Sequence, residues 1–388
     1  RGVVPSPVRA DAVVEKGADE VEEAKGTAGF FSCTINLLKS VIGAGILVIP
    51  FALSQLGWVP GVLTLILAAG LASLGLYLLT IVGHKYGRTA TFGAVAERIF
   101  PKIAIWFDVF VLVKCLGVGS AYLWEIVSLI PDVMKGFMIR SYMSRNPSDT
   151  IEKALEVVEL PNWITYRVVR AIMALIVLAP IASMRKMDSL KYTSFIGMFS
   201  VLYLLVLCIF DFISLAVKKE SYPIKAFVPF SMTAFQAFSI FVFAFNCHQN
   251  IFPIQNEARN NSPRWMSIVT STTMSISLGI YLVFGLLSYG AHEKIDGSIL
   301  KKYPLEKVQY IAARLLYIFV LGCSYPLQSF PSRMSMERII HKISVKTKDY
   351  PRVVYFGSTL FIILFTGAVA SSTIGLKDIL GVIGATAG

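Results

Sequence analysis

The sequence predicts an all-α integral membrane protein, and three observations support this fold class. Apolar residues make up 55% of the 388 residues and charged residues only 15%, whereas soluble domains carry about 25% charge. The apolar residues gather in runs of about 20 residues, the length that a helix needs to cross a bilayer. Two of these runs, at 40–50 and 243–253, carry glycine or polar interruptions at their centres. Unpaired backbone groups are costly in hydrocarbon, so such interruptions are expected only beside a cavity or other protein.

Apolar windows predict at least ten membrane-spanning helices. The tenth begins near residue 377 and is only about half of a span long, so we expect the polypeptide to continue beyond residue 388. If spans one to five and six to ten form two units, the odd number of crossings in each unit inverts the second relative to the first. The nine complete windows are 30–55, 59–83, 103–131, 162–182, 192–216, 230–256, 265–290, 308–330 and 353–371.

Residues 1–28 differ from the rest of the chain and are expected to form a disordered cytosolic tail. Six acidic residues lie between Asp11 and Glu23, and too little apolar surface is present to offset the entropy of ordering. Lysine and arginine gather in the loops predicted on the same side as this tail, which places the tail in the cytosol. The remaining residues, 29–388, then form one transmembrane domain whose last span is truncated.

The net charge of +12 does not indicate a nucleic-acid-binding protein. The basic residues lie in short clusters between apolar runs, a pattern typical of loops beside a membrane, so the lipid bilayer is the expected partner. Five cysteines, odd in number and without CxxC spacing, predict neither a disulfide framework nor a zinc site. Neither HExxH nor GxSxG nor paired intramembrane aspartates occur, so we expect no enzyme activity, cofactor or metal.

The first interruption places Gly43 and Gly45 on either side of Ala44. Glycine permits positive φ angles and removes side-chain bulk, so the helix can unwind there. The N–H groups exposed at the new helix N-terminus would favour an anion such as a carboxylate. A second interpretation stays open, because small residues at such spacing also let two membrane helices pack closely.

The second interruption places four polar side chains within five residues, between apolar flanks: Asn246, His248, Gln249 and Asn250. Polar groups at membrane depth need partners, a cavity or water; otherwise the run caps the cytosolic end of span six. Histidine ordinarily titrates near a pKa of about 6.5. His248 is therefore either a proton relay or pH gate, or a structural histidine hydrogen-bonded within the break.

Several charged residues lie within apolar runs. The Lys39 ammonium, one turn before the glycine break, either supplies a fixed positive charge in place of a coupling cation or reaches the cytosolic interface. Span three contains Asp108, Lys114 and Glu125, and each of them either stabilises a helix end, pairs with a neighbour or carries protons. In span eight, Pro326 predicts a kink, because proline removes a backbone donor.

Four segments of the chain together resemble the amino acid/auxin permease family, and within it the fungal vacuolar amino acid transporters and the animal neutral amino acid transporters. The segments are NLLKSVIGAGILVIPFA at 36–52, FAFNCHQN at 243–250, SYPLQSFP at 324–331 and LGVIGAT at 380–386. The resemblance implies eleven spans in the complete protein. The first ten would form a five-plus-five inverted repeat, with helices one and six discontinuous around the substrate.

The resemblance also implies which residues bind the substrate. Sodium-coupled relatives hold sodium with an asparagine in span one and a threonine in span eight, and the aligned residues here are Lys39 and Ser324. A lysine ammonium in the cation's place argues against sodium coupling and for proton coupling or passive exchange. The substrate's carboxylate and amine are expected against the backbone of Gly43, Ala44, Gly45, Ile46, Phe243, Ala244, Phe245 and Asn246, with span three contributing near Gly119 and Tyr122.

We therefore expect a secondary transporter that moves neutral amino acids by alternating access around the two broken helices. The resemblance favours a vacuolar or lysosome-like membrane over the plasma membrane, and proton-linked transport over sodium coupling, with symport and antiport both open. The alternative is a membrane receptor that binds an amino acid and signals through its tail without net transport. Flux into reconstituted vesicles separates the two.

Overall fold

The computed structural model describes residues 26–183, 191–292, 294–295 and 297–387. Most of the predicted tail lies outside these residues. Its last three residues, 26–28, lie against the end of the second broken helix, where the Ala28 N–H donates to the Glu257 carbonyl (3.0 Å) and the Arg259 N–H donates to the Ala28 carbonyl (2.7 Å). The described residues therefore include three from the predicted tail, 26–28.

The first half of the chain contains five predicted spans, each now a helix or a broken helix. Span one is α2 (Phe30–Val41), the 3₁₀ helix η1 (Ala44–Val48) and α3 (Ile49–Leu56). Spans two to five and their connections are α4 (Trp58–Tyr86), η2 (Gly87–Thr89), α5 (Phe92–Ile99), α6 (Ala104–Arg145), α7 (Ile151–Val157), α8 (Asn162–Thr165), α9 (Arg167–Ala182) and α10 (Lys191–Val217).

The second half repeats this plan. Span six is α11 (Met232–Ala244), the 3₁₀ helix η4 (His248–Asn250) and α12 (Ile251–Glu257). The remaining elements are α13 (Pro263–Ala291), η5 (Ile299–Lys301), α14 (Val308–Ile343), η6 (Val345–Asp349), α15 (Pro351–Ser371) and α16 (Leu376–Ala387).

Seven of the described helices are long and apolar enough to cross a membrane, and the bent pair of span one makes eight. The other two predicted spans correspond to α9, with 16 residues, and α16, with 12. Both are shorter than the roughly 20 residues of a full span. The structure thus contains a helix in each of the ten predicted windows.

Two spans extend further than their apolar windows. The predicted ends at residues 131 and 330 are wrong, because α6 continues to Arg145 and α14 continues through Pro326 and Pro331 to Ile343. Hydropathy detects only the membrane-embedded part of a helix. Beyond it α14 is held by an ion pair between Arg338 and Asp108 at the start of α6, a contact between distant parts of the chain.

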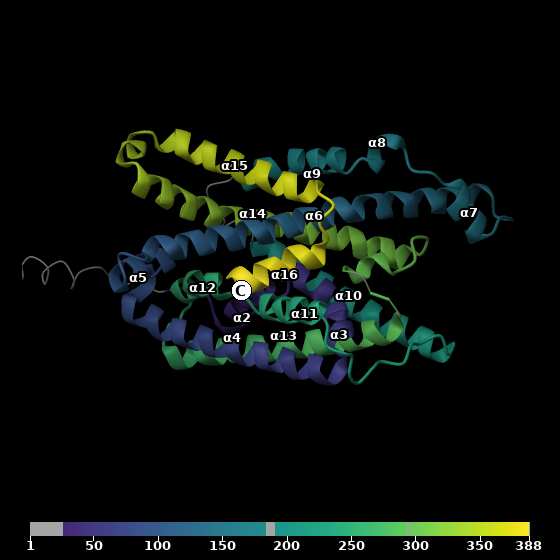
Figure 1. The fold of residues 1–388 in the computed structure, drawn as a ribbon, viewed down its shortest axis with the longest axis horizontal. Helices are drawn as coiled ribbons and strands as arrows, with labels where there is room; N and C mark the ends of the chain where they lie inside the picture. Colours follow the sequence, from purple (N-terminus) through teal and green to yellow (C-terminus); the bar gives the residue numbers. More distant parts are fainter. Residues whose placement is uncertain (1–25, 184–190, 293, 296, 388) are drawn as a thin grey trace, which may run out of the picture.

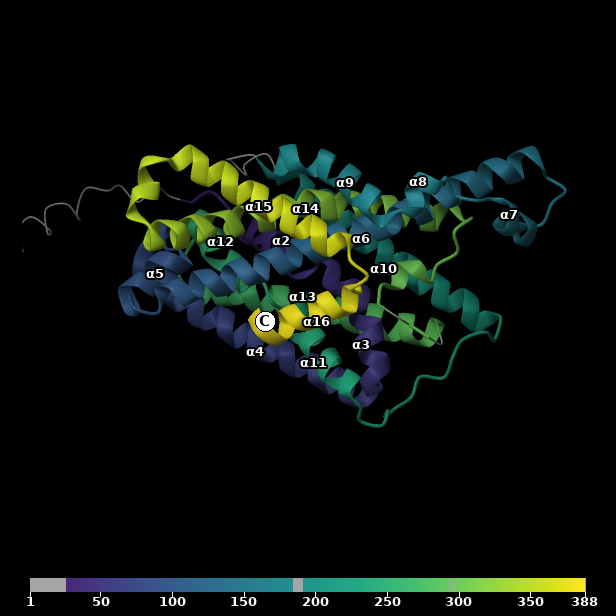
Figure 2. The same ribbon diagram turned by 45° about the horizontal axis from the view of Figure 1, so that its top comes forward.

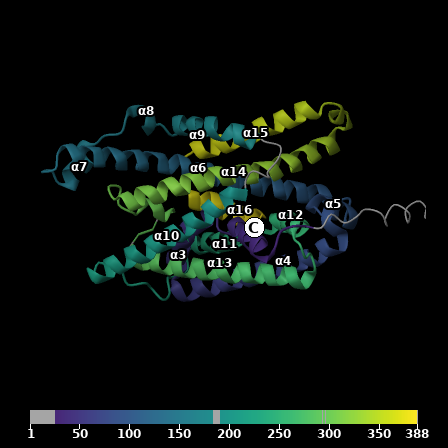
Figure 3. The same cartoon turned by 180° about the vertical axis from the view of Figure 1, so that it is seen from behind.

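The helices run along the long axis of the molecule, with α5 at one end and α7 and α8 at the other (Figure 1). The long helices α6 and α14 lie side by side, with α9 and α15 on one flank (Figures 1 and 3). The turned view keeps α4 and α13 together on the opposite flank (Figure 2). The broken helices α2–α3 and α11–α12 lie between these two groups.

One face of α4 carries large apolar side chains that are left exposed by the part of the protein that the structure describes. Five leucines on this face are each between 53% and 63% exposed. They recur every three or four residues, the spacing of one helix face, while Leu65, Ala72 and Leu76 on the other face are buried. An exposed stripe of this kind is expected to contact lipid. The five residues are Leu63, Leu67, Leu71, Leu74 and Leu78.

Candidate functional site

The first break lies between Val41 and Ala44, where the two pieces of span one meet at 46°. The expectation that glycine supplies a positive φ angle is wrong, because Gly43 has φ −112° and Gly45 is not among the positive-φ glycines of the described chain. At Gly43 the reason for glycine is close approach instead, because a Cβ atom there would lie 2.7 Å from the Tyr122 hydroxyl. A Cβ atom on Gly45 would lie at an ordinary contact distance, 3.4 Å from the Ala244 Cα atom.

Two tyrosines bind the carbonyl groups that the breaks release. The Tyr281 hydroxyl, from α13, lies 2.9 Å from the Val41 carbonyl oxygen and 3.0 Å from the Ala244 carbonyl oxygen, so it touches both broken helices. The Tyr317 hydroxyl, from α14, donates to the Gly43 carbonyl at 2.8 Å. Unpaired carbonyls in a dry interior are costly, and these contacts explain how the interrupted backbone is tolerated.

The second break is held by a lysine from α6. The Lys114 ammonium donates to the Asn246 side-chain oxygen and to the Gln249 side-chain oxygen. Lys114 is only 5% exposed. None of the ion pairs in the described part of the chain includes it, so its charge is met there by neutral oxygens.

This lysine fixes the orientation of both amides. An ammonium group has only donors, so the oxygen of each amide must point toward it and the NH₂ group must point elsewhere. Asn246 and Gln249 both line the cavity between the breaks. The site therefore offers amide N–H donors, held in place by a buried positive charge.

The cavity between the two breaks has a volume of about 20 Å³, which is room for about one water molecule. Its walls come from the first break, α6, the second break and α14. Six of the ten predicted substrate-binding residues line it: Gly43, Ala44, Gly45, Tyr122, Phe243 and Asn246. The other lining residues are Ser40, Val41, Val118, Gln249 and Gln328.

Four predicted substrate-binding residues do not line this cavity. Ile46, Ala244 and Phe245 are buried in the surrounding core. A Cβ atom on Gly119 would face Tyr325 at 3.5 Å, so this position packs against α14 instead. Each of these four residues is next in sequence to a residue that lines the cavity, but its side-chain position lies on a different side of the backbone.

The three predicted coupling residues also lie outside the cavity lining. Lys39 packs against α10, with its Cε atom 3.7 Å from a Cβ atom placed on Gly197. Ser324 is half-buried on α14. His248 packs against Gly75 of α4, and its Nδ1 atom lies 3.3 Å from the Asn246 side-chain oxygen.

Sequence reasoning missed Lys114, Gln249 and Gln328 as site residues. The signal for Lys114 was present, since it is a charge in the middle of an apolar run, and Gln249 belongs to the polar run of the second break. What was missing was their proximity, because the two lie 135 residues apart in the chain.

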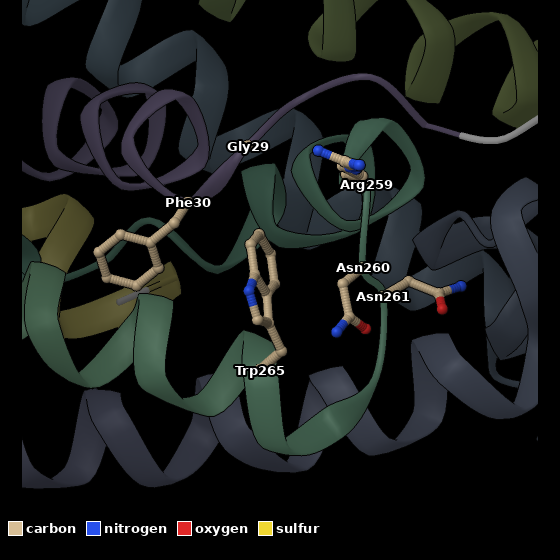
Figure 4. A pocket seen from close by; sticks show the side chains of 6 residues that line it. All are labelled: Gly29, Phe30, Arg259, Asn260, Asn261 and Trp265. Atoms are coloured by element: carbon tan, nitrogen blue, oxygen red, sulfur yellow. The ribbon is translucent and has the colours of Figure 1, made fainter.

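A second, larger cavity of about 540 Å³ lies at the surface, where α2 begins and α13 begins (Figure 4). The Phe30 and Trp265 rings meet edge to face on one side of it, 6.2 Å apart. It is formed by helix ends and a loop, away from both breaks. Its lining is Gly29, Phe30, Arg259, Asn260, Asn261 and Trp265.

Two solved transporter structures share the fold. The nucleobase-cation-symport-1 family transporter MHP1, in a closed conformation with bromovinylhydantoin bound, aligns with a TM-score of 0.59 and 13% identity over 93% of this chain and 76% of that chain. MhsT in complex with L-phenylalanine aligns with a TM-score of 0.54 and 12% identity over 94% of this chain and 87% of that chain. These similarities confirm the predicted five-plus-five inverted-repeat fold with discontinuous helices one and six.

The sequence comparisons concern amino acid transporters. Vacuolar amino acid transporter 5 of Schizosaccharomyces pombe is 33% identical over 367 residues, 93% of this chain and 81% of that protein. Vacuolar amino acid transporter 6 of Saccharomyces cerevisiae is 29% identical over 86% of this chain and 73% of that protein. The family model described as transmembrane amino acid transporter protein matches residues 26–388. The chain therefore belongs to the transmembrane amino acid transporter family.

Proposed function

We propose that this protein is a secondary transporter that moves neutral amino acids by alternating access, with transport linked to protons and not to sodium. The observation that carries the proposal is the meeting of both helix breaks at one small cavity with fixed N–H donors. Because similar proteins are named vacuolar amino acid transporters in two yeasts, we place the protein in a vacuolar or lysosome-like membrane.

The cavity supports a zwitterionic substrate. The first turn of η1 leaves backbone N–H groups without helical partners, and the amides of Asn246 and Gln249 add further donors, so a carboxylate would be well bound. The tyrosine hydroxyl of Tyr122 and the carbonyl groups at the breaks can accept hydrogen bonds from an amine.

The preference for a neutral side chain follows from the rest of the lining. Val41, Val118 and Phe243 are apolar, and the lining contains neither a carboxylate nor a basic side chain. A cationic substrate would lack a countercharge and would face the nearby Lys114 ammonium, which disfavours it. An apolar side chain meets neither difficulty.

Alternating access is supported by the size of the cavity. An amino acid is much larger than the one water molecule that fits in about 20 Å³, so binding requires the walls to separate. The short half-helices α2 and α12 are the natural moving parts on one side. They are joined at their ends by the backbone contacts of Ala28, so they would move together.

Proton linkage is proposed from Lys39, whose side chain extends from α2 just before the first break and packs against Gly197 of α10. A fixed positive charge there repels a sodium ion and can replace it in stabilising the helix arrangement. Ser324 on α14 would then be a neighbour of this charge and not a sodium ligand.

The test is uptake of a labelled amino acid panel into proteoliposomes, with proton and sodium gradients imposed separately. We expect accumulation of neutral amino acids under a proton gradient and no response to sodium. Proteoliposomes carrying the Gly45→Val variant serve as the matched control. Binding without accumulation under any gradient would refute transport and favour a receptor.

A further inference from the structure

Glu125, on α6, is a fully buried acid, and one of its two carboxyl oxygens has no hydrogen-bond partner. Its exposed fraction is 0%. One carboxyl oxygen accepts a hydrogen bond of 2.6 Å from the Ser298 hydroxyl, just before η5, and the other is buried without a hydrogen-bond partner. Buried polar atoms are nearly always paired, so an unpaired carboxyl oxygen at this position requires an explanation.

The charges around Glu125 do not neutralise it by direct contact. Arg167 of α9 and Lys301 of η5 face it, but each of them lies over the Trp124 ring, at 4.4 Å and 4.8 Å from the ring centre. The acidic group that faces it is Asp132, two turns further along α6. Within the described residues, no cation lies within 4.0 Å of the Glu125 carboxyl group.

The two other buried acids of the described chain each lie beside a basic side chain. Asp108 forms an ion pair with Arg338. Asp211 accepts a hydrogen bond from Tyr310 through Oδ1, and its Oδ2 atom, which has no hydrogen-bond partner, lies 3.3 Å from the His292 Nε2 atom. Among the described residues, Glu125 has no basic group at such a distance. A carboxylate without a countercharge is expensive in a dry interior, whereas a neutral carboxylic acid is tolerated far better.

The position of Glu125 connects it to the cavity. It follows Tyr122, a lining residue, by three positions on α6, which is about 4.5 Å along the helix. Tyr317, which donates to the Gly43 carbonyl at the first break, faces Glu125 from α14. Glu125 therefore lies between the cavity and the segment 298–301, which covers it on the side where α6 extends toward α7.

We propose that Glu125 carries the transported proton, an inference that rests on the proposed proton-linked transport. In the closed state the group is a neutral acid. When the segment 298–301 moves away, water reaches the carboxyl group, the O–H bond breaks and the proton passes to water, leaving a carboxylate. The reverse transition takes a proton from hydronium in water, forms the O–H bond and permits the group to be buried again.

The test compares Glu125→Gln with wild type in proteoliposomes. Glutamine has nearly the same shape and cannot release a proton. Exchange of labelled for unlabelled amino acid, with equal pH on both sides, should stay within about twofold of wild type, because exchange passes through the closed state with a neutral group at this position and requires no net movement of protons. Accumulation driven by a proton gradient should fall at least tenfold. The matched control is Glu156→Gln, an exposed glutamate on α7, which should change neither.

Three outcomes overturn the inference. One is gradient-driven accumulation retained by Glu125→Gln; another is loss of exchange in a correctly folded variant. If Glu125→Gln does not fold, Ser298→Ala decides the matter. Ser298→Ala removes the hydroxyl that donates to the Glu125 carboxyl group, which should move the pH midpoint of uptake upward. An unchanged midpoint is the third outcome that would overturn the inference. Wild type that accumulates nothing under a proton gradient would instead refute the proposed coupling.

Discussion

Replacing Lys114 by methionine removes the ammonium group and keeps a long, unbranched side chain of similar size. Three hydrogen bonds are lost, to the side-chain oxygens of Asn246 and Gln249 and to the Asn246 backbone carbonyl (3.4 Å). Hydrogen bonds to charged groups contribute about 1.5–3 kcal/mol each. Without the ammonium, both amides are free to turn their oxygens toward the cavity, where an oxygen would repel the substrate carboxylate.

The expected effect is on substrate binding. If reorientation removes one charged hydrogen bond to the substrate, the loss of about 1.5–3 kcal/mol corresponds to a rise in KM of roughly 10- to 150-fold. The assay measures initial uptake against amino acid concentration in proteoliposomes. Lys114→Arg should restore part of the affinity, since a guanidinium group also has only donors.

The matched control is Lys153→Met. Lys153 is an exposed lysine on α7, far from the cavity, and it pairs with Asp149. The KM of this variant should equal that of wild type. A Lys114→Met protein that folds normally and keeps the wild-type KM would refute the idea that this lysine orients the amides.

Three further variants test the two breaks. Gly45→Val should abolish uptake with near-normal expression, because a Cβ atom would already be in contact with Ala244, 3.4 Å from its Cα atom, and the two methyl groups of valine need further space beside the cavity that Gly45 lines; retained uptake contradicts a cavity at this glycine. Lys39→Asn should change the dependence on proton and sodium gradients more than KM, and unchanged ion responses would count against its coupling role. Tyr281→Phe should lower the free energy of unfolding by about 1–3 kcal/mol, because a buried carbonyl loses its donor; an unaltered thermal midpoint would contradict this.

The spans and both breaks could be predicted because their signals are local. A run of about 20 apolar residues marks a membrane helix wherever it occurs. Glycines at 43 and 45, or four polar side chains after Phe245, interrupt such a run visibly. The cost of unpaired backbone in hydrocarbon then requires a compensating environment, and this requirement does not depend on the rest of the fold.

The arrangement of the site could not be predicted in the same way, since it depends on contacts between distant residues. Lys114 meets Asn246 across 132 positions of the chain, and Asp108 meets Arg338 across 230. Which face of α6 lines the cavity depends on how that helix is rotated. A small rotation separates Tyr122, which lines it, from Gly119, which packs against α14.

The hydrogen bonds of Tyr281 bear on the proposed transport cycle. The Tyr281 hydroxyl has one proton and two carbonyl neighbours, Val41 and Ala244, so only one of them accepts it at a time. When the breaks separate, the tyrosine can stay with either half-helix and lose no hydrogen bond. A closing network of this kind opens at a cost of a few kcal/mol, which substrate binding can offset if the two states bind it differently.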